Sequence, residues 1–231
     1  MTMSISALLR LLQLSDSSYP TGGYSLSHGL EGLHAMGCLS GEEDVREVAL
    51  THIEETLAQQ DLPAVGHAHQ HASRAEFAAI VTLDELLTLL KPVPAFRDAS
   101  KRVGRRMMES TLPLYTSPVA GRYLDAIRTD ATDGHHAVAF GVATHAAGIE
   151  QGAAVAAYGA SSLNSYVAAA VRLGVIGQGA AQRIITALEP ALAAAIAVAP
   201  TVGPEDLGGY TPFIDIAGMR QPALAARMFA S

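Results

Sequence analysis

The stretch from Gln151 to Val171 carries no charged side chain and consists largely of Ala, Ser and Gly with a few larger apolar residues. A helix that is apolar or small on every side must lie in the centre of a fold or be buried against another chain. The stretch also contains Asn164, and it is less hydrophobic than the segments of about 20 residues that cross lipid. We therefore predict a buried helix from Glu150 to Arg172.

The composition predicts an all-α, single-domain multi-helix bundle with no significant sheet. Hydrophobic residues make up 49% of the chain and charged residues 16%, so the chain can build a packed core. Ala is abundant and favours helix, because its side chain loses no rotamer freedom there. β-branched residues are scattered singly, which disfavours strands. We expect one domain over residues 1–231, in which residues 201–231 form a Gly- and Pro-punctuated tail that orders on partner binding.

Charge and cysteine content exclude several classes of protein. The formal net charge of −7 disfavours binding to nucleic acid or to anionic membranes, since both rely on basic surface. Cys38 is the only cysteine, which excludes an internal disulfide and fits a reducing compartment. The N-terminus lacks the basic and small-residue features of a secretory signal. We expect a soluble cytoplasmic protein that binds neither nucleic acid nor a membrane.

Helical periodicity recurs along the chain. Two faces with helical spacing stand out: Ile5, Leu8, Leu9 and Leu12 in the first, and Val45, Ala49, Ile53 and Leu57 in the second. Ser40 and Glu43 have the spacing of a capping box that begins the second of these helices. Ser117 followed by Pro118 predicts another helix start.

A histidine cluster, His67, His69 and His71, suggests metal binding. On a helix His67 and His71 lie four residues apart, a spacing that can bind a transition metal. No nearby carboxylate completes a ligand set, so we predict no metal site and interpret the row as a solvated or partner-facing helix surface. Two alternatives remain open, a metal-dependent hydrolase and a nickel-binding metallochaperone that uses His67 and His71. Metal content after dialysis would separate both from a metal-free protein.

The sequence contains no P-loop, GxGxxG, GxSxG or CxxC motif. These patterns mark nucleotide-binding loops, nucleophile elbows and redox or zinc sites. We find no convincing set of nucleophile, base and acid elsewhere. The chain is therefore predicted not to be an enzyme, and no tightly bound cofactor is expected.

The segment from Tyr19 to Glu31 has a high density of special residues. Gly22 and Gly23 permit backbone angles that other residues tolerate poorly, and we expect Tyr24 and His28 to be exposed. Such a turn, which leads directly into an apolar helix, is typical of a shaped contact surface.

Three ordered blocks of this sequence resemble the family of urease accessory proteins called UreF. They are residues 11–16 with 20–25 and 27–31, residues 168–174 with 177–178 and 182–183, and residues 212–220 with 227–231. The departures lie mainly in the tail, where Gln221 and Pro222 stand in place of a frequent His-Glu pair.

The resemblance implies an all-helical homodimer that acts as an adaptor. Similar proteins bind UreD (also called UreH) and the GTPase UreG, and together these act on urease apoprotein during nickel insertion. Nickel would then be handled by the assembled complex. The residues that we predict to contact partners are Tyr24, Ser27, His28, Glu31, Arg172, Gln178, Arg220, Arg227 and Phe229.

Overall fold

The computed structural model describes residues 3–223 and 228–230, and within these ranges it contains helices and loops but no strand. The predicted all-α fold is confirmed. The α-helices are α1 (Ile5–Ser15), α2 (Leu30–Ala35), α3 (Glu42–Thr51), α4 (Leu62–Ser73), α5 (Phe77–Leu90), α6 (Pro94–Thr111), α7 (Pro118–Arg128), α8 (His136–Ala146), α9 (Gln151–Arg172), α10 (Gln178–Val198) and α11 (Pro212–Arg220). The short 3-10 helices are η1 (Gly23–Ser25), η3 (Ala199–Thr201), η4 (Pro204–Asp206) and η5 (Gln221–Ala223), and η2 (His52–Asp61) is a π-helix.

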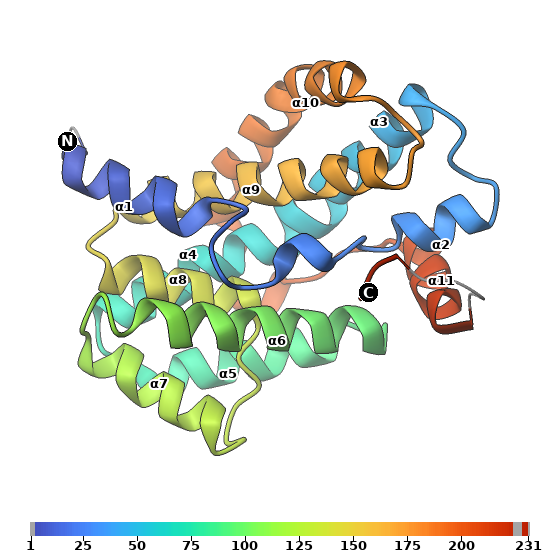
Figure 1. Cartoon of the computed structure of the whole chain (residues 1–231). Coiled ribbons are helices and arrows are strands. Elements are labelled where there is room, and N and C mark those ends of the chain that lie inside the picture. Colours follow the sequence, from blue (N-terminus) through green and yellow to red (C-terminus); the bar gives the residue numbers. More distant parts are fainter. Residues whose placement is uncertain (1–2, 224–227, 231) are drawn as a thin grey trace.

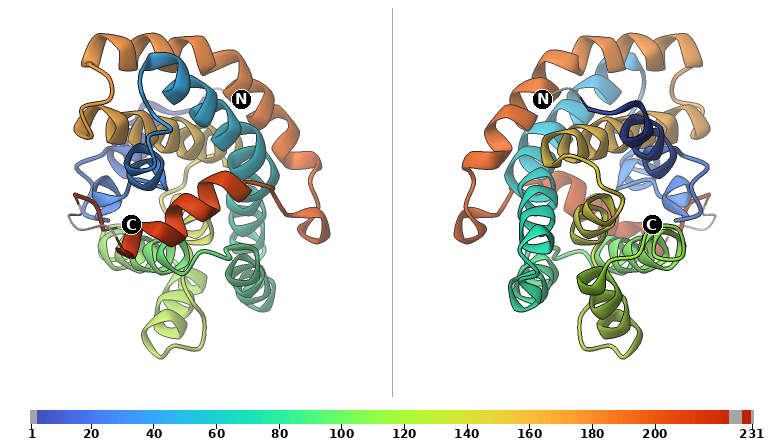
Figure 2. Two further views of the ribbon diagram at one scale, coloured as in Figure 1. Left: turned by 90° about the vertical axis from the view of Figure 1, so that its right-hand side faces the viewer. Right: turned by 90° about the vertical axis from the view of Figure 1, so that its left-hand side faces the viewer.

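Helices α4 and α8 pack against each other in the middle of the molecule (Figure 1). Helices α9 and α10 lie on one side of this pair, and α5, α6 and α7 lie on the other (Figures 1 and 2). The predicted helix around Glu150 to Arg172 is confirmed as α9. It contacts α1, α4, α8 and α10, so its apolar surface is covered largely from within the chain.

One continuous helical run is formed by α3, η2 and α4. The predicted face of Val45, Ala49, Ile53 and Leu57 is fully buried. The π-helix widens the middle of this run. Pro63 has no N–H, so it cannot bond the carbonyl oxygen of Gln59 four residues before it. That oxygen accepts a hydrogen bond from the backbone N–H of Gly208 at 3.0 Å.

Two predicted helix starts have different outcomes. Ser117 caps α7, and its hydroxyl oxygen accepts the N–H of Ala120. The predicted capping box of Ser40 with Glu43 is wrong, because Ser40 bonds to Asp44 and not to Glu43. The N–H of Ser40 donates to the Asp44 carboxylate at 2.7 Å, because a carboxylate one residue further on reaches back more directly over the extended backbone at Gly41.

Asp84 on α5 ties that helix to the loop before α8. Its side chain is fully buried, and its carboxylate accepts hydrogen bonds from the Thr132 hydroxyl at 2.7 Å and from the N–H groups of Gly134 and His135 at 2.5 and 2.7 Å. Burial raises the pKa of the Asp84 carboxyl group, while these hydrogen bonds oppose the rise. The loop is therefore fixed by one buried acceptor.

The apolar face of α1 points into solvent. Ile5 and Leu9 are 78% and 62% exposed, whereas Leu11 and Leu14 on the opposite side are buried. Among the described residues, one run of helix, Gln178–Thr201, is long and apolar enough by length and composition to cross a membrane, and only 28% of its most apolar window is buried. The apolar faces of α1 and α10 thus lack cover within the described part of the chain.

The described part of the C-terminal tail packs on its own domain. Helix α11 lies across α2 and contacts α6 (Figure 2). Its residues Ile214 and Ala217 are buried against α2. Gly32 on α2 makes this approach possible, because a Cβ there would lie 2.7 Å from the carbonyl carbon of Ala217 and closer still to its oxygen. The expectation that residues 201–231 order on partner binding stays a prediction.

Candidate functional site

The turn that precedes α2 depends on two glycines. Gly22 has φ of +77°, as predicted, and Gly29 has φ of +90°. The prediction for Gly23 is wrong, because this residue lies inside η1 with negative φ, and the second left-handed position has moved to Gly29. His28 itself adopts φ of +50°. This backbone turns Tyr24 outward and His28 inward.

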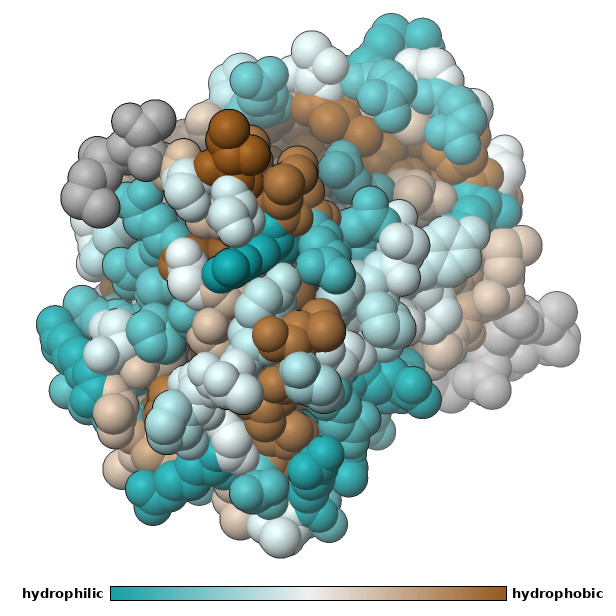
Figure 3. Space-filling model, turned by 60° about the vertical axis from the view of Figure 1, so that its left-hand side comes forward, coloured by the Kyte–Doolittle hydropathy of each residue, from teal (hydrophilic) through white to brown (hydrophobic). Residues whose placement is uncertain are grey.

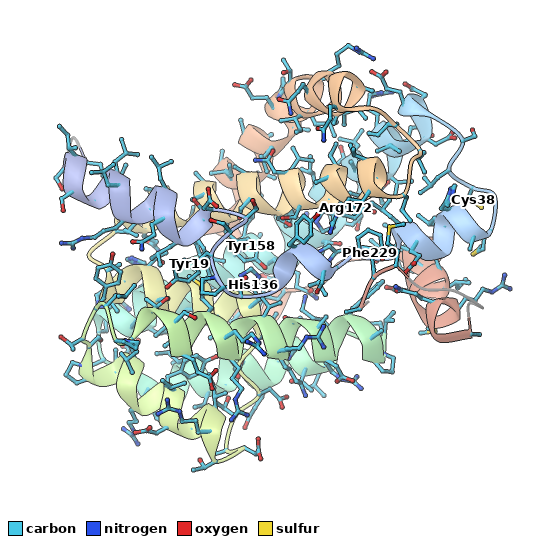
Figure 4. All side chains as sticks on the ribbon, in the orientation of Figure 1. Tyr19, Cys38, His136, Tyr158, Arg172 and Phe229 are labelled. Atoms are coloured by element: carbon cyan, nitrogen blue, oxygen red, sulfur yellow. The ribbon has the colours of Figure 1, made fainter. Side chains whose placement is uncertain are left out.

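Arg172, near the end of α9, lies between two aromatic rings. The guanidinium carbon is 4.0 Å from the ring centroid of Tyr24 and 4.6 Å from that of Phe229. The Arg172 side chain also donates to the carbonyl oxygens of Tyr24 and Ala168. Tyr24 is 59% exposed and Phe229 only 5%. Figure 4 shows Arg172 and Phe229 close together. Cation–π stacking therefore joins the turn, α9 and the end of the chain.

Glu31 holds the same end of the chain from the other side. Its buried carboxylate accepts hydrogen bonds from the Gln221 side-chain amide at 2.6 Å and from the backbone N–H of Met228 at 2.5 Å. The N–H of Ala230 donates to the carbonyl oxygen of Ser25 at 2.9 Å. We call the set of Tyr24, Glu31, Arg172, Gln221 and Phe229 the tail clamp.

The tail clamp brings together four of the predicted contact residues, Tyr24, Glu31, Arg172 and Phe229, although none of the three sequence blocks predicts their mutual contact. Ser27 is fully buried beside them.

The other predicted contact residues have different surroundings. Within the described ranges, no hydrogen bond or ring contact joins the exposed Gln178 or Arg220 to the tail clamp. Arg227 lies outside the described residues. The expected exposure of His28 is wrong, because its ring lies near His52 and Tyr166 with centroid separations of 6.1 and 6.3 Å.

Behind the turn lies a cavity of about 380 Å³. The imidazoles of His28, His52 and His136 line it, together with Asp61 and Tyr158. Figure 4 shows Tyr158 and His136 reaching toward each other from α9 and α8, and their rings are 5.0 Å apart. We call this space the histidine cavity.

Its electrostatics are set by burial. Burial lowers the pKa of His28 and His136 to about 4 and that of His52 to about 3, so all three are neutral at pH 7. Burial alone would raise the pKa of Asp61, but the ammonium group of Lys91 at 2.9 Å outweighs it and the net pKa is lowered.

Sequence reasoning missed the histidine cavity. Its residues come from segments that are far apart in the chain, so no local spacing marks them. One feature of the sequence could have indicated the cavity. His52, Gln60 and Asp61 are polar residues in a helical run whose periodic positions are buried, and buried polar groups need partners.

The histidine row on α4 makes internal contacts. His67 Nε2 lies 2.8 Å from the carbonyl oxygen of Val202, and His69 Nε2 lies 2.8 Å from that of Ile149. His71 Nδ1 lies 2.7 Å from the carboxylate of Glu76. In the part of the chain that the structure covers, no group of three or more His, Cys, Asp or Glu side chains could hold a metal ion. No contact here favours the metallochaperone or hydrolase alternative.

Comparison with known proteins gives one consistent result. The family model described as UreF matches residues 39–189. The chain is 30% identical to the protein named Urease accessory protein UreF from Trichodesmium erythraeum (strain IMS101), over 98% of each chain. It is also 30% identical to the protein of that name from Bacillus sp. (strain TB-90), over 98% of this chain and 100% of the relative. A relative of the same name from Lachnoclostridium phytofermentans is 31% identical over 97% and 98% of the two chains.

Proposed function

Since the chain belongs to the UreF family of urease accessory proteins, we propose that it is a non-catalytic adaptor in the maturation of the nickel centre of urease. In this proposal it bridges UreD (also called UreH) and the GTPase UreG in the cytoplasm, and through them it acts on urease apoprotein. Nickel is then cargo of the assembled complex, and this chain needs no tightly bound cofactor.

The observation that carries the proposal is uncovered apolar surface at two separate places. At one end of the molecule lies the face of α1, and Figure 3, which brings that side forward, shows hydrophobic side chains at its surface. At the other end (Figure 1), Phe213, Ile216 and Met219 are each about half exposed on the outer side of α11. A bridge between two proteins needs two such surfaces, and isolated apolar patches of this kind mark protein contacts.

We assign the outer face of α11 to UreD, and the tail clamp supports this assignment. It fixes the C-terminal segment to the turn and to the end of α9, so a partner that moves this segment would also alter the packing of Arg172 against Tyr24. Contact by one partner thereby affects the surface offered to the next.

UreD capture tests this proposal. Ile216→Asp places a charge on the outer face of α11 without touching the clamp, and it should reduce co-purification of UreD at least tenfold. Ala78→Asp, at an exposed position on α5, is the matched control and should have no effect. Deletion of residues 212–231 should abolish capture while helical content persists. If both Ile216→Asp and the truncated chain capture UreD as well as the full chain does, the α11 assignment is wrong.

The proposed homodimer rests on α10. Helix α9, which the sequence predicts to be central or buried against another chain, is covered largely by its own chain and so does not supply the dimer face. Helix α10 instead exposes a row of small and apolar residues, including Ala187, Ala194 and Val198. Small side chains let two helices approach closely, so we assign this face to a second copy. Ala194→Glu should convert the dimer to a monomer in light scattering at micromolar concentration, and a monomeric unsubstituted chain would contradict the assignment.

A further inference from the structure

The histidine cavity has the size and enclosure of a small-molecule site. Its volume of about 380 Å³ falls within the range of roughly 300–1,000 Å³ that such sites have. Its walls come from the turn, η2, α6, α8, α9 and the tail segment before α11. The wall includes the π-helix, and π-helical segments occur frequently at functional sites.

One wall offers unused hydrogen-bonding groups. Within the described ranges, the ring nitrogens of His28 and His136 make no hydrogen bond, and both residues keep accessible surface. A neutral imidazole provides one donor and one acceptor. Ser165 on α9 also lines the cavity. Polar groups in such a wall can bind a ligand that has both donors and acceptors.

The ammonium group of Lys91, which lines the cavity, is already paired. Lys91 Nζ donates to Asp61 at 2.9 Å and to the side-chain oxygen of Gln60 at 2.8 Å, and the Tyr158 hydroxyl donates to Asp61 at 3.2 Å. Two further carboxylates in the lining accept neutral donors: Glu55 accepts the N–H of Tyr210 at 3.1 Å, and Asp215 accepts the hydroxyl group of Thr211 at 3.4 Å. An anionic ligand would meet these carboxylates, and a cationic ligand would have to displace the donors that they already hold and lose its own hydration. Both are costly in a buried site.

Another part of the lining forms an apolar wall. Leu26, Val103 and Phe96 line it, and Phe96 presents an aromatic ring. A flat ring can pack on these apolar side chains and on the imidazoles, which are themselves planar. We propose that the histidine cavity binds a small, uncharged, planar aromatic amide or a closely similar heteroaromatic molecule, with its ring on the apolar wall and its amide group toward His28 and His136.

The tail closes this site. The segment that crosses the mouth is held by the bond from Gly208 N–H to the Gln59 carbonyl at 3.0 Å and by the bond from Tyr210 N–H to Glu55. A molecule in the cavity adds contacts beneath that segment, which leads directly into α11. Occupancy therefore stabilises the docked tail, independently of whether the chain serves urease.

Three matched probes test the proposal on the full chain. Nicotinamide, nicotinate and 1-methylnicotinamide share one ring and carry charges of 0, −1 and +1. In an NMR titration, nicotinamide should perturb residues of the cavity saturably and bind at least tenfold more tightly than either charged analogue. It should also slow hydrogen exchange of the Gly208 and Tyr210 amides. Absence of binding at 20 mM nicotinamide, or equal binding of a charged analogue, would overturn the proposal.

Variants locate the binding. His136→Phe keeps a planar ring and removes both nitrogens, so it should weaken nicotinamide binding at least fivefold. Ser165→Leu fills the cavity and should abolish binding, with helical content as the check on folding. His145→Phe, on the same helix but away from the cavity, should bind as the unsubstituted chain does. Binding that survives both Ser165→Leu and His136→Phe lies elsewhere and refutes the assignment.

Discussion

A methyl group added at Gly32 tests whether the tail docks as the structure shows. Its Cβ would lie 2.7 Å from the carbonyl carbon of Ala217, and backbone cannot yield as a flexible side chain does. Gly32→Ala must therefore push α11 away from α2. Helix propensity alone acts in the opposite direction, since Ala in place of Gly stabilises a helix interior by up to about 1 kcal/mol.

The size of the effect follows from the interactions that hold α11 and the C-terminal segment against α2. Burial of Ile214 contributes about 1.5–3 kcal/mol, and the two hydrogen bonds to the Glu31 carboxylate add about 1.5–3 kcal/mol each before the entropy of ordering the tail is subtracted. Overpacking of this kind costs about 1–3 kcal/mol. A loss of about 2 kcal/mol in the docking free energy raises the opening equilibrium of α11 roughly 30-fold.

Native-state hydrogen exchange measures this directly. The amides of α11 should exchange about 30-fold faster in Gly32→Ala, while the amides of α8 should keep their rates. Gly121→Ala is the control, because its added methyl group meets open space on α7. If α11 exchanges at the same rate or more slowly in Gly32→Ala, the tail does not dock on α2 in solution.

Three further predictions follow from buried and exposed groups. The free energy of unfolding should fall as pH drops from about 6.5 toward 4, because the folded chain keeps His28, His52 and His136 neutral with lowered pKa values while the unfolded chain protonates them. Urea titrations at several pH values measure this, and a flat profile over that interval would contradict it. Asp84→Ala leaves three buried donors without an acceptor and should lower the free energy of unfolding by about 3–5 kcal/mol. Urea titration measures this loss, and a value below about 1 kcal/mol would refute the anchoring role of Asp84. Tyr24→Ala alone should leave the melting temperature nearly unchanged and reduce urease activation. The double variant Tyr24→Ala with His28→Ala should melt at a lower temperature, because the His28 ring is packed inside. Equal melting temperatures of the single and double variants would count against this packing.

Local signals in the sequence account for much of the fold. The uncharged stretch predicts α9 to within one residue at its start, and the cap at Ser117 predicts α7, because both depend on neighbours a few residues away. The exposed face of α1 shows the limit of this reasoning. Periodicity tells that Ile5 and Leu9 share a side of a helix, but not whether the chain or another protein covers that side.

The candidate site was predicted only in part. Tyr24, Glu31, Arg172 and Phe229 were named from family blocks, while the stacking that joins them depends on tertiary contacts across most of the chain. The histidine cavity was not predicted, because the pairing of Asp61 with Lys91 depends on where the end of α5 lies relative to the end of η2 and not on any local pattern. The π-helix was likewise missed, since its extra residue per turn has no distinct periodic signature at this length.

The most direct test of the adaptor role is the state of urease in cells that lack this protein. In a urease-positive host from which the gene has been deleted, urease apoprotein should accumulate at its normal level but contain little nickel and show little activity. Expression of the full chain should restore both the nickel content and the activity, and the Ile216→Asp variant should not. Urease that is fully active and fully loaded with nickel in the deletion strain would contradict the account.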